Sequence, residues 1–275
     1  MIDFSLTLRA LTYSVANVRS AAWLSLPFYV VWVVQQFLMT VQTVGLNASL
    51  YDGRAFGALP MPSLIMVTLP LAFVAFILSL ITFVGWHRLV LLDERPRALV
   101  ALPTRRVWRY FLAGFKVALV LLVVLIPIGA LALLFLRIGG AIASETIGAR
   151  GLVTWLFLLA VSCIAVFVAL RLNLVLPAAA VDDRSMDLRL AWRRSEPYSK
   201  ALAGLAVAFV GSSAVVDWLG TFLVSALPFG LYANVLLSYL LTMAASLFVF
   251  FVAIVAISLV YHEVTKPLDK AAPGS

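Results

Sequence analysis

Polar side chains recur at helical spacing inside the most apolar parts of this sequence, and they are the first candidates for chemistry. Asp217 lies deep in an apolar run, with Ser213 four residues before it and Thr221 four residues after it. A second stripe, again at spacings of four, lies near the C-terminus: Ser238, Thr242 and Ser246. Since residues three and four apart share a helix face, we expect the two stripes to meet and exchange hydrogen bonds. The stripes are interpreted as an interhelical polar contact or, alternatively, as a proton or cation site.

Two adjacent amides, Gln35 and Gln36, lie in the first apolar run. An amide in hydrocarbon needs hydrogen-bond partners, so we expect both side chains to face other helices rather than lipid. If the chain carried a small solute or an ion, these amides and Asp217 would line its path.

Catalytic motifs are absent from the sequence. It contains no GxSxG, HExxH, Walker-type or GxGxxG pattern, so we predict no catalytic residue and no cofactor. The two histidines, His87 and His262, each end an apolar run and are interpreted as interfacial aromatics. With Glu263 they would form a metal site only if those runs were neighbours, and we predict no metal. The acidic residues after the fourth run are interpreted as part of a solvated turn: Asp182, Asp183 and Asp187.

The composition places these residues in a membrane. Of 275 residues, 64% are hydrophobic and 12% charged, and the mean hydropathy is +1.10. Soluble domains average about 45–50% apolar and about 25% charged residues, so soluble and disordered classes are excluded. A membrane span needs about 20 residues, which allows roughly six spans. The expected spans are 23–43, 64–86, 111–136, 152–170, 201–218 and 235–261.

Basic residues predict the orientation. Sixteen of the twenty Lys and Arg residues fall at the termini and in the second and fourth connections, and three fall in the other connections. Positive charge collects on the cytoplasmic side, so both termini are expected there. Arg dominates over Lys, a bias typical of GC-rich bacterial genomes, and we expect a multi-pass protein of a bacterial inner (cytoplasmic) membrane.

The six spans group into three helical hairpins, each preceded by a basic amphipathic stretch. The units cover about 4–88, 97–173 and 185–263, within a single all-α polytopic domain of residues 1–265 and a short cytoplasmic tail, 266–275. FLAGFKVAL at 111–119 matches ALAGLAVAF at 201–209 in five positions, which favours internal duplication. The single cysteine, Cys163, excludes an intramolecular disulfide.

The amphipathic stretches are expected to lie along the membrane surface. In the first, the apolar residues fall on one helical face: Phe4, Leu8, Leu11, Val15 and Val18. The later two stretches carry the candidate contacts for lipid or other anions: Arg105, Arg106, Arg109, Arg189, Arg193 and Arg194. Plain anchoring of the spans by arginine is the alternative. Ser195 is expected to cap the fifth span, with Pro197 in its first turn.

One passage resembles a known family. Residues 171–204 read RLNLVLPAAAVDDRSMDLRLAWRRSEPYSKALAG. This is similar to the R-x-x-L-x-L-P-x-x-x-V…S…A-W passage of bacterial six-helix membrane proteins related to the membrane domain of glycerophosphodiester phosphodiesterases. The matching residues are Arg171, Leu174, Leu176, Pro177, Val181, Ser185, Ala191 and Trp192. The resemblance implies the six-helix layout and no activity, because the His-Arg-Gly and Glu-Asn signatures of the phosphodiesterase barrel are missing.

The sequence therefore predicts a non-enzymatic membrane scaffold or accessory protein. Its basic cytoplasmic face would contact anionic lipid headgroups or a membrane protein partner, and not nucleic acid. The alternative is a small-solute or ion carrier that uses polar residues of the first, fifth and sixth spans. A lipid-modifying enzyme, the third class, lacks any nucleophile and base pair in this sequence.

Overall fold

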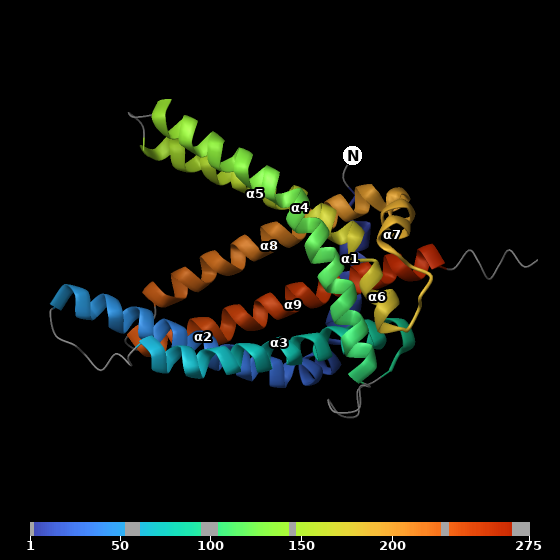
Figure 1. Ribbon diagram of the computed structural model, residues 1–275, viewed down its shortest axis with the longest axis horizontal. Coiled ribbons are helices and arrows are strands. Elements are labelled where there is room, and N and C mark those ends of the chain that lie inside the picture. The colour runs from blue at the N-terminus through green and yellow to red at the C-terminus, as the bar shows by residue number, and fades with distance from the viewer. Residues whose placement is uncertain (1–2, 53–60, 95–103, 143–146, 227–230, 266–275) are drawn as a thin grey trace, which may run out of the picture.

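A computed structural model describes residues 3–52, 61–94, 104–142, 147–226 and 231–265, and the elements in these ranges are all helices (Figure 1). Within them, six helices are long and apolar enough to cross a membrane, which confirms the predicted all-α, polytopic class. These are α2 (Val18–Asp52), α3 (Met61–Leu92), α4 (Thr104–Ile142), α5 (Ile147–Leu172), α8 (Ser199–Ala226) and α9 (Leu231–Thr265). The shorter elements are α1 (Ser5–Ala16), α6 (Val175–Ala180), α7 (Leu188–Arg194) and the 3-10 turn η2 (Glu196–Tyr198).

The spans are helical because hydrocarbon offers no hydrogen-bond partners, so each backbone group must be satisfied within its own segment. Consecutive spans pack as the predicted hairpins, α2 with α3, α4 with α5 and α8 with α9. Helix α9 is central and also contacts α1, α2 and α3. The α4–α5 hairpin reaches the rest mainly through α5 on α8 and α4 on α6, and it diverges from α2 and α3 in Figure 1.

The packed core lies at one end of the bundle, beside α1, α6 and α7 (Figure 1). Trp86 near the end of α3 and Phe251 in α9 are each about 1% exposed, and their ring centroids are 5.1 Å apart. Leu202, in the first turn of α8, is fully buried in the same cluster. All the short helices therefore rest on the best-packed part of the protein.

Helix α1 has its apolar stripe on the outside. The buried side consists of Leu6, Ala10 and Ser14, and α1 packs with it against α8 and α9. The five stripe residues predicted from the sequence, Phe4 to Val18, are between 39% and 63% exposed. A helix with one side packed on the bundle and an exposed apolar side fits a position in the membrane interface, where acyl chains cover the apolar side.

Candidate functional site

The two predicted polar stripes meet in part. The Ser238 hydroxyl of α9 donates to the carbonyl of Gly220 in α8 at 2.9 Å, and Thr242 packs against the same glycine. The Thr242 hydroxyl donates back to the carbonyl of Ser238 at 2.8 Å. Ser246 lies half-buried one turn further along α9. The α9 stripe thus contacts α8, and it does so at a residue without a side chain.

Asp217 lies away from this contact, which corrects our expectation that it would meet the α9 stripe. It is exposed and lines a cavity of about 390 Å³ between α5 and α8, together with Ser162 and Ser213. Asp217 shares this cavity with Leu158 and Leu159 of α5, whereas Gly220 is the α8 residue that contacts Ser238 and Thr242 of α9. Gln35 and Gln36 are half-buried on α2. The two glutamines do not line the cavity that Asp217 lines.

We expect Asp217→Asn and Asp217→Leu to change the free energy of unfolding by less than about 0.5 kcal/mol, as is usual for exposed positions. The measurement is denaturant unfolding in mixed micelles. A loss of several times that size with Leu alone would show that the carboxylate is a buried structural partner. A loss of a growth or transport phenotype with Asn, at unchanged stability, would favour the carrier alternative.

The six predicted arginines divide into two sets. Arg106 Nε and Arg109 Nη1 donate to the two carboxylate oxygens of Asp182, at 2.6 and 2.5 Å. Partial burial alone would raise the pKa of Asp182, but hydrogen bonds and charge attraction from both arginines hold that pKa below its ordinary value. These two arginines join α4 to the end of α6. They are already engaged within the protein.

Three of the four remaining arginines face outward. Arg105, Arg189 and Arg193 are exposed and make no salt bridge within the described part of the chain. Arg194 is half-buried. Burial would raise the pKa of Asp183, but hydrogen bonds from Tyr261 and Ser185, together with the charge of Arg194, hold that pKa below its ordinary value. We call the exposed trio of Arg105, Arg189 and Arg193 the basic face. Its members belong to α4 and α7, at the same end of the bundle as α1 (Figure 1).

The acidic residues predicted to lie in a solvated turn do lie in a turn, with Asp182 and Asp187 exposed, and they also organise it. Asp182 adopts a left-handed backbone (φ 64°), which ends α6 and which aspartate tolerates better than most residues. Asp183 accepts hydrogen bonds from the Tyr261 hydroxyl at 2.6 Å and from the Ser185 amide at 2.8 Å. Asp187 caps α7 by accepting from the Leu190 amide. Each carboxylate therefore has a structural role.

Arg171 is a key residue for which the sequence predicted no individual role. It was noted only among the basic residues of the fourth connection and in the passage, 171–204, that resembles a known family. Its guanidinium is buried, donates to the Ser195 hydroxyl at 2.9 Å and to the Trp192 carbonyl at 2.6 Å, and stacks on the Trp192 ring at 3.8 Å. Ser195 was expected to cap the fifth span and does not. Its hydroxyl donates to the Trp192 carbonyl instead, and a 3-10 turn, η2, separates it from α8.

Arg88 and His87 are also buried. Arg88 pairs with Glu94 and donates to the Ala180 carbonyl at 3.0 Å. His87 contacts the Ser258 hydroxyl at 2.8 Å, so its interpretation as an interfacial aromatic was wrong. His262 is exposed and Glu263 binds Arg9, so the structure does not gather these side chains around one point.

These observations define an all-α, polytopic membrane protein with six candidate spans in its described residues, in which the short helices lie at one end. Comparison with protein-family models, curated proteins and solved structures gives no match to this chain. The likeness to the phosphodiesterase-associated membrane domain stays a prediction.

Proposed function

We propose that the chain is a non-enzymatic accessory or scaffold protein of a bacterial inner membrane, and that its basic face contacts anionic lipid headgroups on the cytoplasmic side. The observation that supports this most is the combination of exposed arginines, which form no salt bridge with the residues that the structure describes, with the outward apolar stripe of α1 at one end of the bundle. An exposed apolar stripe is stabilised by contact with acyl chains, and cations at the same end of the bundle are then near the lipid headgroups.

The engaged arginines sharpen the proposal. Because Arg106 and Arg109 share Asp182, a headgroup would have to compete with an existing ion pair for them. Arg105, Arg189 and Arg193 carry no such competitor among the described residues. The lipid contacts therefore belong to the basic face rather than to all six arginines. A membrane protein partner with an acidic surface is the alternative occupant.

The test is a triple variant, Arg105→Gln, Arg189→Gln and Arg193→Gln. Each arginine near an anionic surface contributes about 1 kcal/mol, so we expect phosphatidylglycerol binding to weaken on the order of 100-fold at low salt. Binding is measured as lipid retained by the purified protein, with phosphatidylcholine as the neutral reference.

The matched control removes the same charge from the opposite side, where the sequence predicts Arg54, Arg137 and Arg150. That variant is expected to retain phosphatidylglycerol like the parent protein. Equal retention by all three proteins at intact folding would contradict lipid binding. Retention that falls equally in both variants would show that total charge, and not the basic face, attracts the lipid.

A further inference from the structure

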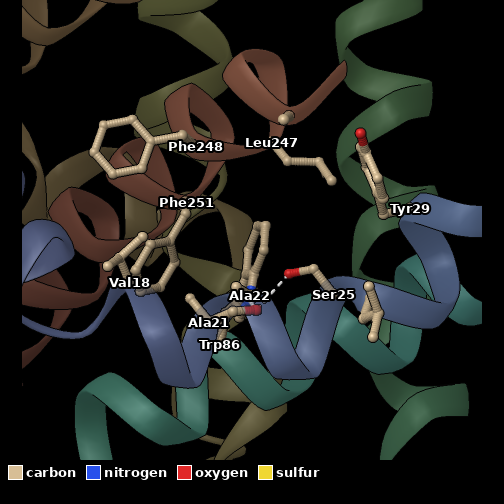
Figure 2. Close-up of a pocket in the computed structure, with 11 residues that line it drawn as sticks. Val18, Ala21, Ala22, Ser25, Tyr29, Trp86, Leu247, Phe248 and Phe251 are labelled. Carbon is tan, nitrogen blue, oxygen red and sulfur yellow. Dashed lines mark hydrogen bonds between the residues drawn. The ribbon is translucent and has the colours of Figure 1, made fainter. Parts of the chain in front are cut away.

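A cavity of about 290 Å³ lies between α2, α3 and α9, and it is apart from the basic face. Figure 2 shows Ala22 and Ser25 of α2 on one wall and Phe248 and Phe251 of α9 on the other. We propose that this cavity binds one acyl chain of an anionic membrane phospholipid, with the headgroup beside Arg19.

The lining offers a polar solute no free side-chain hydrogen-bond donor, because its three donors are already used. The Ser25 hydroxyl donates to the Ala21 carbonyl at 2.5 Å, shown as the dashed line in Figure 2. The Tyr29 hydroxyl donates to the Leu240 carbonyl at 2.6 Å, and the Trp86 indole donates to the Ala21 carbonyl at 3.4 Å. What remains is carbon surface, which suits a hydrocarbon chain.

The size and position of the cavity match one leaflet of a bilayer. All its lining residues lie within the candidate spans of α2, α3 and α9, where the surrounding solvent is hydrocarbon. From Val18 to Tyr29 the α2 wall extends about 16 Å at 1.5 Å per residue. Half of a hydrocarbon core of about 30 Å is nearly the same length. The volume is roughly twice that of an apolar cavity of about 150 Å³ that accepts benzene.

The mouth of the cavity has both an apolar approach and a positive charge. Val18, the first residue of α2, lines the cavity and continues the exposed apolar stripe of α1, so apolar surface runs from α1 into the cavity. Arg19 is exposed, one helical turn before the lining residue Ala22, and makes no salt bridge among the described residues. A guanidinium at this position suits a lipid phosphate.

The experiment uses the full chain in nanodiscs with phosphatidylglycerol that carries a diazirine in the middle of one acyl chain. Photolabelling is expected on the peptides that contain residues 18–29 and 244–251, mapped by mass spectrometry. Ala22→Phe and Ala244→Phe fill the cavity from opposite walls and should each abolish this label. Ala118→Phe, at an exposed alanine of α4, is the matched control and should keep it.

A second arm tests the headgroup with Arg19→Gln. Labelling by the phosphatidylglycerol probe should fall, while labelling by a phosphatidylcholine probe with the same chain should stay unchanged. Equal loss of both probes would overturn the role of Arg19. Label spread as densely over the exposed side of α4 as over the cavity would overturn the site, even without any variant. Neither result depends on the basic-face triple variant, so this proposal and the proposed function fail separately.

Discussion

Arg171→Leu is expected to lower the free energy of unfolding by about 3 kcal/mol, because the buried guanidinium makes two hydrogen bonds worth about 1.5–3 kcal/mol each. Its removal also leaves the Ser195 hydroxyl and the Trp192 carbonyl without their charged donor. Lysine keeps the charge but cannot reproduce the planar, two-pronged contact or the stacking on Trp192. The free energy of unfolding of Arg171→Lys should therefore lie between those of the parent protein and Arg171→Leu. Denaturant unfolding in mixed micelles gives the three values.

Arg193→Leu is the control for this prediction. It removes an arginine from the same passage, only 22 positions later, but from an exposed site on α7. Its effect should stay within about 0.5 kcal/mol. If both leucine variants cost the same, the guanidinium of Arg171 would not hold α7 on α5, and the account of this passage would be wrong.

The second large effect concerns two glycines at helix contacts. A Cβ added at Gly85 would lie 2.5 Å from a methyl carbon of Leu24, and one at Gly220 would lie 2.6 Å from the methyl carbon of Thr242. Gly85→Val and Gly220→Val should therefore force α3 from α2 and α8 from α9, at a cost of about 1–3 kcal/mol each. Small residues serve this purpose between membrane helices, where close backbone approach stabilises packing.

Gly211 provides the comparison within α8. Nothing lies within 4 Å of a Cβ at this position, and glycine is a poor helix former, so Gly211→Val should leave stability unchanged or slightly raised. The unfolding midpoint is measured for all three variants in the same detergent. A Gly211→Val variant as unstable as Gly220→Val would mean that valine itself, and not the interhelical contact, causes the loss.

The spans and the outward stripe of α1 follow from the sequence, because both depend on local periodicity and on hydrophobicity alone. The five stripe residues repeat at helical spacing, and a helix places them on one side whatever it packs against. The predicted hairpins follow in the same way, since short connections make neighbouring spans antiparallel.

The roles of individual charges do not follow from local pattern. Arg171 and Arg193 look alike in the sequence, and only packing between elements decides that one is buried under Trp192 and the other exposed. The prediction that Asp217 meets the Ser238 stripe was based only on its neighbours along the chain. The surroundings of this residue depend on the rotation of α8 against α5 and α9, which a single glycine contact influences. The apolar cavity likewise combines three helices, and no sequence motif marks it.

The most direct test of the account is the side of the membrane on which the basic face lies. Three single-cysteine variants are made in a Cys163→Ala background. One replaces Arg189 on α7, and the other two replace Arg97 and Arg54, which lie outside the described ranges. A membrane-impermeant thiol reagent should label the cysteines at 189 and 97 only from the cytoplasmic side, and the cysteine at 54 only from the opposite side. Labelling of positions 54 and 97 from the same side would contradict the six-span arrangement and, with it, a cytoplasmic basic face that contacts anionic lipid.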